Sequence, residues 1–286
     1  MGTLIVILLV TLLFLLLSAL TLPFPVNDSG VVRYETIPWM TGTIIIINTA
    51  VFLLWQAPDL IDYLEADTLV GEQVASFRYA EKVWVYGFRE IYLTDGQSIG
   101  AFTSLTSMFM HGDFTHLIGN MVYLWAFGRR VEDACGPWRY LLFYLFAGMV
   151  ATMGFALLTE AGVDRPGIGA SGAVSGVMGA YLLLFPTARM QCVWVLALAI
   201  RLLAWVLSAI FGGDVKWKWT VEIPVLLLLG FYIFNNLVPT VETIESGDLT
   251  GGVNYVAHMA GFLSAICIFF FLRKDLLVRY MTGRRL

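Results

Sequence analysis

Long apolar runs dominate this chain and restrict its fold more than any other feature. Eight runs approach the length of about 20 residues that an α-helix needs to cross a bilayer, and 59% of all residues are hydrophobic against 13% charged. The runs lie at 3–22, 40–56, 114–128, 138–159, 171–187, 190–211, 219–238 and 253–272. This pattern excludes a soluble domain and predicts an all-α, polytopic membrane helix bundle.

Lys and Arg in short loops mark the cytoplasmic side of a membrane protein. Basic residues follow the run at 114–128, lie between the runs at 171–187 and 219–238, and follow the last run. The loop before 171–187 has Arg165 as its one basic residue, and the loop after 219–238 has acidic residues and no basic ones. Those two loops are therefore expected to face outward.

The chain is expected to have three parts. Residues 1–38 form a hydrophobic N-terminal helix and a linker; the helix is interpreted as retained because it has neither a basic leader nor an obvious small-residue cleavage site. Residues 39–273 form the core, with a long outer loop at 57–112. Residues 274–286 form a basic cytoplasmic tail.

All three histidines of the chain, His111, His116 and His258, lie at or within predicted spans. Ionisable groups there are costly and tend to face a bundle interior or a wet cavity, so each is a candidate site residue. His116 and Asn120 are four positions apart and share one helix face. One such histidine is as often a structural hydrogen-bond partner, but three together with an asparagine favour a functional site.

The same residues argue against a metal site. His111 and His116 are five positions apart, the HExxH pattern of metalloproteases is absent, and no acidic residue neighbours His258. No cofactor is expected. The three cysteines are odd in number and scattered, which indicates packing rather than disulfides. Nucleic acid is not expected as a partner, because the chain has no block of basic residues that suggests it.

The segment GIGASGAVSG at 167–176 places Ser171 where a helix is predicted to begin. A serine is a weak nucleophile until a base takes its proton, and the oxyanion then formed needs fixed donors. First-turn N–H groups have no intrahelical partner, and the helix dipole favours negative charge there. Gly169 and Gly172 allow a sharp turn and keep the site open. The alternative is that Ser171 is only an N-cap.

Small residues recur every four positions beside Ser171 and beside His258. They are Gly172, Gly176 and Ala180 in the first stripe and Ala257, Gly261 and Ala265 in the second. This spacing lets two membrane helices approach closely, although it also serves packing alone. Because each stripe is displaced by one residue from Ser171 or His258, contact between the stripes would bring the hydroxyl and the imidazole together.

Three segments in register carry a family likeness, and through them the chain resembles the rhomboid intramembrane serine proteases. The segments are LTSMFMHGDFTHLIGNMVYLWAFGRRVEDACG (105–136), GIGASGAVSGVMGAY (167–181) and AHMAGF (257–262). The resemblance covers most of the chain from about residue 40 to 272. It implies a six-helix protease core to which the first apolar run is an added helix.

The resemblance also implies roles for single residues. Ser171 would be the nucleophile and His258 the general base, a dyad without an acidic third member. His116 and Asn120 would stabilise the oxyanion with the Ser171 N–H, and His111 would lie at the mouth of the site. One departure is Ser175, four residues after the nucleophile, where some members carry a tyrosine stacked on the catalytic histidine; other contacts must then orient His258.

Family members cut other membrane proteins in or near the membrane, with water from the outer side. The resemblance therefore implies transmembrane protein substrates and the lipid bilayer as partners. It also implies a multi-pass protein of a bacterial inner or plasma membrane whose site opens outward. The alternative is a catalytically inactive relative that binds membrane proteins or acts in quality control. The presence of both Ser171 and His258 favours a serine endopeptidase.

Two apolar runs lie between Ser171 and His258, and only one of them can cross. The two side chains reach the same depth only if their helices run in the same direction, which requires a single return span. The segment 192–211 is predicted to be interfacial or re-entrant, because Arg201 falls at its midpoint and Trp194 and Trp205 suit an interface.

The run at 219–238 is predicted to be the less firmly packed return span. It carries Glu222 and Pro224 near one end and Asn235 and Asn236 near the other. By analogy with the family it should border the path by which a substrate enters from the side, with the loop ESGDLTGG (245–252) as a mobile cap.

Overall fold

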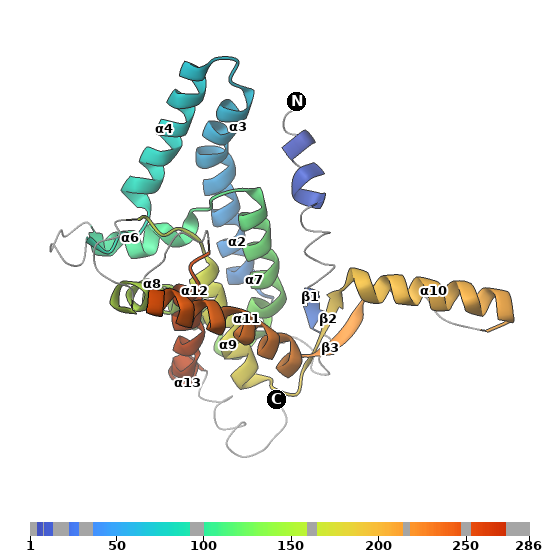
Figure 1. The fold of residues 1–286 in the computed structure, drawn as a ribbon. Helices are drawn as coiled ribbons and strands as arrows, with labels where there is room; N and C mark the ends of the chain where they lie inside the picture. Colours follow the sequence, from blue (N-terminus) through green and yellow to red (C-terminus); the bar gives the residue numbers. More distant parts are fainter. Residues whose placement is uncertain are drawn as a thin grey trace.

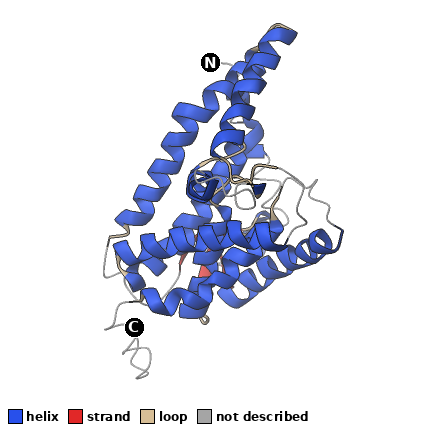
Figure 2. Ribbon diagram, turned by 90° about the vertical axis from the view of Figure 1, so that its left-hand side faces the viewer, coloured by secondary structure: helices blue, strands red, loops and turns tan. Residues whose placement is uncertain are grey.

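The structure is a computed structural model that describes residues 5–7, 9–13, 23–28, 37–91, 100–158, 165–213, 218–246 and 253–272. Helices predominate, which confirms the all-α bundle (Figures 1 and 2). The elements are β1 (Phe24–Asp28), α2 (Trp39–Val51), the π-helix η1 (Phe52–Gln56), α3 (Ala57–Glu65), α4 (Leu69–Tyr86), α6 (Gly100–Thr106), the 3₁₀-helix η2 (Ser107–Phe109), α7 (Phe114–Cys135), α8 (Pro137–Leu158), α9 (Ser171–Leu184), β2 (Arg189–Val193), α10 (Val195–Phe211), β3 (Val221–Pro224), α11 (Val225–Ser246), α12 (Tyr255–Leu263), the 3₁₀-helix η3 (Ser264–Cys267) and α13 (Ile268–Phe271).

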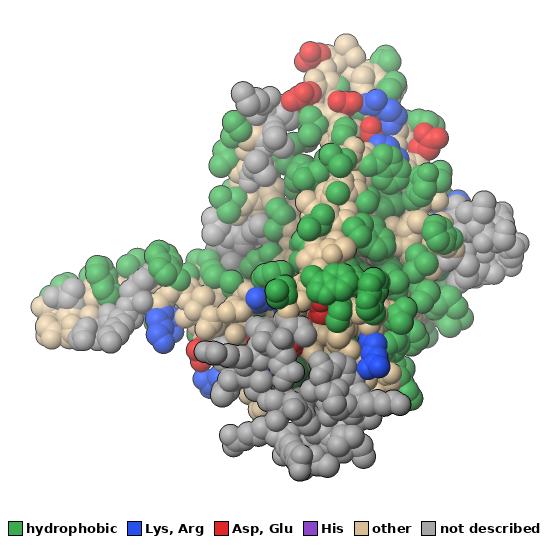
Figure 3. All heavy atoms as spheres, turned by 180° about the vertical axis from the view of Figure 1, so that it is seen from behind, with side chains coloured by type: hydrophobic (Ala, Val, Ile, Leu, Met, Phe, Trp, Pro, Cys, Tyr) green, Lys and Arg blue, Asp and Glu red, His purple; other side chains and the backbone are tan. Residues whose placement is uncertain are grey.

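Three helical segments of the described chain are long and apolar enough to cross a membrane. They are Trp39–Glu65, which runs through α2, η1 and α3, then Pro137–Leu158 and Val225–Ser246. Shorter apolar helices lie at Ser171–Leu184, Val195–Ser208 and Tyr255–Phe271. Hydrophobic side chains cover much of the middle of the face in Figure 3, and acidic and basic ones gather at the tip above it. The chain is thus an integral membrane protein.

Short polar residues fix where the site helices begin. Asp113 caps α7 by accepting a hydrogen bond from the His116 backbone N–H (2.8 Å), and Asn254 caps α12 by accepting from Ala257 (2.9 Å). These side chains satisfy first-turn donors that lack intrahelical partners. At its other end α7 stops at Gly136, whose φ of 79° suits glycine. Both caps lie next to candidate site residues.

The core surrounds α9, which packs against α7, α8 and α12. Glu132, a buried carboxylate on α7, caps the start of α2 by accepting hydrogen bonds from the backbone N–H groups of Met40 (2.9 Å) and Thr41 (2.7 Å). α7 continues past the apolar run predicted at 114–128 and ends at Cys135, so Arg129 and Arg130 lie within the helix. The long α7 therefore ties α2 to the centre of the bundle.

The outer loop expected at 57–112 contains a helical pair that the sequence analysis did not predict. α3 and α4 pack side by side and project from the bundle (Figure 1). Asp59, which is buried, pairs with Lys82 (2.5 Å) and Arg78 (3.5 Å) across the two helices. The two cations offset the free-energy cost of burying the Asp59 carboxylate. These ion pairs therefore hold α3 against α4.

A small antiparallel sheet, in the order β1-β2-β3, is the second feature that the sequence analysis missed. β1 lies in the part expected to be a linker, and the apolar run at 190–211 divides into β2 and α10. Phe24 pairs with Val193, and Cys192 pairs with Val221. Arg130 of α7 forms an ion pair with Asp28 of β1 (3.6 Å), which anchors the sheet to the bundle.

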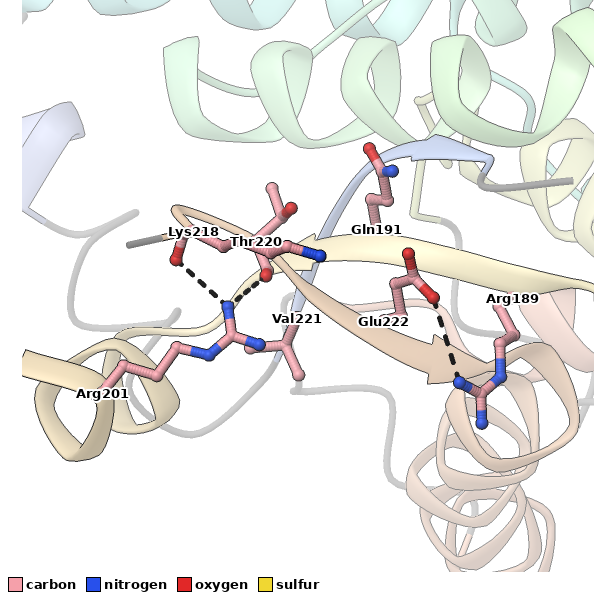
Figure 4. A pocket seen from close by; sticks show the side chains of 7 residues that line it. All are labelled: Arg189, Gln191, Arg201, Lys218, Thr220, Val221 and Glu222. Carbon is pink, nitrogen blue, oxygen red and sulfur yellow. Dashed lines mark hydrogen bonds and ion pairs between the residues drawn. The ribbon is translucent and has the colours of Figure 1, made fainter. Parts of the chain in front are cut away.

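α10 leaves the bundle from this sheet and extends sideways, roughly across the direction of α2 and α7 (Figure 1). The chain leaves through β2 and returns through β3, and these strands are hydrogen-bonded neighbours, so both ends of the excursion lie at one level. Arg201 donates hydrogen bonds to the carbonyls of Lys218 (3.1 Å) and Thr220 (2.5 Å) (Figure 4). These two oxygens satisfy donors of its guanidinium group. Consistent with the prediction that this segment does not span, α10 is not among the three described helical segments long and apolar enough to cross a membrane.

Parts of the sequence-based predictions concern residues that the structure does not describe. These are most of the N-terminal helix, of which 5–7 and 9–13 are described and helical, most of the cap at 245–252, and the tail at 274–286.

Candidate active site

Ser171 is the first residue of α9 and follows a backbone turn that only glycine suits. Gly169 has a φ of +125°, and its N–H donates to the Ser107 carbonyl (2.9 Å). A Cβ at Gly169 would lie 2.7 Å from Nε2 of His116 and 3.6 Å from Oγ of Ser171. The turn therefore brings the His116 ring and the Ser171 hydroxyl to the same glycine.

α9 and α12 touch through their backbones and run in the same direction. A Cβ at Gly261 would collide with the Gly172 carbonyl oxygen, one at Gly176 would lie 3.0 Å from the Gly261 oxygen, and one at Gly179 would lie 2.6 Å from the Phe262 oxygen. Residue numbers rise together along both helices, as in a parallel pair. The close-packed stripe continues through Gly179 rather than through Ala180, the position expected from the sequence.

His258 lies on α12 and is held by α11. Its Nδ1 lies 2.9 Å from Oδ1 of Asn236. Among the described residues, no hydrogen bond joins the Ser171 hydroxyl to His258. From the sequence, Asn236 was interpreted only as a sign of loose packing, and its contact with His258 was not predicted. The signal that could have indicated the contact is the presence of a polar side chain inside an apolar span.

His116 presents a donor toward Gly169. Its Nδ1 accepts a hydrogen bond from the Gly112 backbone N–H (3.3 Å), so in the neutral ring the proton is on Nε2, the atom nearest Gly169. Asn120, one turn further along α7, is buried, and its Nδ2 has no hydrogen-bond partner within the described part of the chain. Two side-chain donors of α7 are thus left for another acceptor.

The structure places His111 differently from the expectation that it lies at the mouth of the site. Its side chain is fully buried, with its ring 6.5 Å from that of Phe52 and 5.1 Å from that of His116. Neither ring nitrogen has a hydrogen-bond partner among the described residues. His111 is therefore enclosed by the rings of Phe52 and His116 and does not lie at the mouth of the site.

Two residues that the sequence analysis did not single out hold the segment before α7. Gln56 bonds both the N–H (3.0 Å) and the carbonyl (3.1 Å) of His111. The Tyr79 hydroxyl lies within hydrogen-bond distance of the carbonyls of His111 (3.2 Å) and Gly112 (3.1 Å). Burial, together with the nearby charge of Asp113, raises the pKa of Tyr79 to about 12. Tyr79 therefore remains a donor at neutral pH.

Ser175, at the position where some family members carry tyrosine, bridges α9 and α11. Its hydroxyl donates to the Ser171 carbonyl (2.7 Å) and lies 2.5 Å from the Tyr232 hydroxyl. The ring of Tyr232 lies beside that of Phe262 on α12 (6.0 Å between centroids). A tyrosine is thus present near the site, supplied by α11 instead of by the helix of the nucleophile.

A cavity of about 50 Å³ opens beside Ser171, between α8, α9 and α12. A larger hollow of about 440 Å³ lies at the sheet and is lined by Arg189, Arg201 and Glu222 (Figure 4). Ser171 lines the smaller cavity and not the larger hollow, so the smaller cavity is the candidate site despite its size. No group of three or more His, Cys, Asp or Glu side chains in the described ranges is placed to hold a metal ion.

Comparisons with known proteins identify the family of the chain. Residues 100–275 match the family model described as "Rhomboid domain". Rhomboid protein 1, mitochondrial, of Saccharomyces cerevisiae is 31% identical over 146 residues, which is 50% of this chain and 36% of the yeast protein. Rhomboid-like protein 11, chloroplastic, of Arabidopsis thaliana is 26% identical over 178 residues, 59% of this chain and 52% of the plant protein.

A third relative is the putative rhomboid protease YdcA of Bacillus subtilis, 36% identical over 78 residues, which is 27% of this chain and 38% of that protein. The chain thus spans between about a third and a half of the length of these relatives. Because mitochondrial and chloroplastic proteins are among them, the expected bacterial inner membrane is not supported. The matched family model covers more than half of the chain, which therefore belongs to the rhomboid family.

Proposed function

We propose that the chain is an intramembrane serine endopeptidase that cleaves transmembrane proteins within or near the bilayer. The observation that carries the proposal is the backbone contact between α9 and α12. It sets the helix that begins with Ser171 parallel to the helix that bears His258. Relatives named as rhomboid proteases support the same reaction class.

In this reaction Ser171 Oγ attacks the scissile carbonyl while His258 takes the hydroxyl proton as general base. The C–N bond then breaks as the imidazolium returns a proton to the leaving amine, and an acyl-enzyme remains on Ser171. A water molecule, deprotonated by the same histidine, hydrolyses the ester and restores the serine. The two side chains are not hydrogen-bonded to each other in the free protein, and such contacts often tighten only when substrate is bound.

The oxyanion that forms in each step is stabilised by donors that are already in place. These are the Ser171 backbone N–H at the helix N-terminus, the Nε2–H of His116 and the Nδ2 of Asn120. The last two are the unpaired donors of α7. Donors of this kind favour the charged transition state over the neutral substrate.

The small cavity beside Ser171 favours small side chains next to the cleaved bond. Its volume of about 50 Å³ leaves no room for a large group, and Phe88, Met108 and Phe155 line it together with glycines and alanines. The site opens to the outer side, in line with the expected orientation of the loop before α9, and water reaches it from there.

The test is cleavage of a membrane-anchored reporter in proteoliposomes. Ser171→Ala and His258→Ala should each abolish turnover, and the double variant should lose no more, because nucleophile and base act as a unit. Ser264→Ala is a matched control, since this buried serine bonds only the Gly261 carbonyl within its own helix (2.6 Å). Substantial turnover by either single variant would rule out the dyad.

The second candidate function is binding without cleavage, as an inactive quality-control factor. Capture of the reporter by the wild-type protein, with no product over many hours, would support binding without cleavage. If Ser171→Ala captures the reporter but only the wild type releases product, the protein is an enzyme.

A further inference from the structure

We propose that Asn236 is a positioning residue that fixes the tautomer of His258, so that the buried site contains a serine, a histidine and an asparagine on three helices. The inference rests on the proposed function and adds a third member that the dyad lacks. It starts from the hydrogen bond of 2.9 Å between Asn236 Oδ1 and His258 Nδ1. Asn236 is 7% exposed, so water does not compete freely for this contact.

The orientation of the Asn236 amide is set by its own helix. Its Nδ2 donates to the Tyr232 carbonyl one turn earlier (2.8 Å), which leaves Oδ1 turned to the imidazole. A carbonyl oxygen only accepts hydrogen bonds, so the proton of the neutral ring must be on Nδ1 of His258. The lone pair is then on Nε2, the nitrogen left for the proton of Ser171. This is the role that a carboxylate fills in Ser-His-Asp triads.

A second hydrogen bond holds the same face of α11 in place. The one hydroxyl proton of Ser175 goes to the Ser171 carbonyl (2.7 Å), so in the contact between Ser175 and Tyr232 the tyrosine is the donor (2.5 Å). Tyr232 and Asn236 are four residues apart and lie on one helix face. One face of α11 therefore bonds both the helix of the nucleophile and the helix of the base.

This arrangement links the orientation of the base to the position of α11. Moving α11 away from α12 would break the bond to His258 and free the ring to rotate and exchange tautomers. Proton transfer to His258 is then faster while α11 is docked. Besides Asn236, the buried residues of α11 are Val225, Leu228, Leu229 and Thr240.

The kinetic test uses three variants of the full chain in proteoliposomes. Asn236→Leu keeps the size and removes the acceptor; its kcat should fall by about 10- to 100-fold, the loss expected for a hydrogen bond to a group that becomes charged, with KM little changed. Asn236→Asp retains an acceptor oxygen and should recover most of that loss. Asn235→Leu is the matched control, because Asn235 makes the same one-turn bond, to Phe231 (2.8 Å), but is exposed and away from His258.

Equal losses in Asn235→Leu and Asn236→Leu, an unchanged kcat in Asn236→Leu, or no recovery in Asn236→Asp would overturn the inference. A merely structural role would lower the melting temperature and kcat and raise KM in the two Asn236 variants.

A spectroscopic test does not depend on turnover. Nitrogen-15 NMR of labelled histidine in micelles of Ser171→Ala protein should show His258 as the Nδ1–H tautomer, and Asn236→Leu should shift it toward the Nε2–H form. His258→Gln assigns the signal. If the tautomer is fixed by Asn236 but the wild type never cleaves a reporter, the proposed function fails and the positioning stands. Cleavage with no change of tautomer in Asn236→Leu would refute the positioning instead.

Discussion

α9 and α10 are both short apolar helices of the same half of the chain, yet one lies at the centre of the bundle and the other outside it. Eleven of the fourteen residues of α9 are buried, whereas no described side chain of α10 is. α9 contains three glycines and α10 none. Lipid tails are as apolar as leucine, so apolar character alone does not draw a helix into a bundle.

The difference shows that close backbone approach, not hydropathy, selects the helices of the site. At Gly179 and Gly261 the backbone of the facing helix occupies the space of a side chain. At Gly172 the Cβ of Ala151 on α8 does so. α10 presents leucines, isoleucines and two aromatic residues, and with Arg201 tied to its own return segment it suits the membrane interface.

The largest effect is expected for a polar residue of the packed region. Asn120→Ala should lower the rate of reporter cleavage by about 10²- to 10³-fold, the usual cost of losing one oxyanion donor, while the backbone donor remains. Ser208→Ala on α10 should leave the rate within about twofold, because that hydroxyl bonds only the Trp205 carbonyl of its own helix. An Asn120→Ala enzyme as fast as wild type would place Asn120 outside the site.

A smaller, structural effect is expected at the contact between α9 and α12. Gly261→Ala places a methyl group against the Gly172 carbonyl and should destabilise the protein by about 1–3 kcal/mol. Gly230→Ala on α11 has open space around it and should stabilise its helix by up to about 1 kcal/mol. Unfolding in mixed micelles measures both. Changes of opposite sign in the free energy of unfolding would support close backbone packing of α9 against α12, and equal changes would contradict it.

The position of α10 predicts a labelling pattern. Single cysteines in place of the exposed residues Arg189 and Lys218, in a variant without the three native cysteines, should both react from the cytoplasmic side. Met190 is a poor labelling site because it is fully buried. Labelling of the two positions from opposite sides would mean that the segment between them crosses the membrane.

The smallest effect is expected at high pH in the outer helical pair. Because the folded protein raises the pKa of Tyr79 from 10.0 to about 12, its hydroxyl contributes stability below pH 10 that is lost as pH rises toward 12. Tyr79→Phe should therefore make stability depend less on pH between 10 and 12. Identical pH dependence of the two proteins, measured by unfolding in micelles, would mean that Tyr79 is not buried in this way.

Much of the fold and of the candidate site follows from the sequence because it rests on local patterns. The apolar runs gave most of the helices of the bundle, and the glycine stripes gave the contact between α9 and α12. The need for Ser171 and His258 to reach one depth removed one run from the spanning set, and Arg201 indicated which one. The apolar runs and the glycine stripes each depend on residues within a few turns of one another.

The rest depends on contacts between distant segments, which no local pattern encodes. β1 pairs with β2, which lies more than 160 positions later in the chain. Residues 190–193 of β2 belong to an apolar run that predicted a helix, so the local pattern did not indicate a strand. The bond from Asn236 to His258 requires knowing which face of α11 meets α12. The burial of His111 depends on Phe52, a residue of another helix.

The most direct test of the account is covalent labelling of the intact protein by a serine-reactive fluorophosphonate. The account predicts a single adduct, located by peptide mass spectrometry on Ser171, in the wild type and in Ser264→Ala. It predicts none in Ser171→Ala and at least about 100-fold slower labelling in His258→Ala, because the unassisted hydroxyl is a weak nucleophile. An adduct on another serine, or labelling of His258→Ala at the wild-type rate, would contradict the claim that His258 activates Ser171.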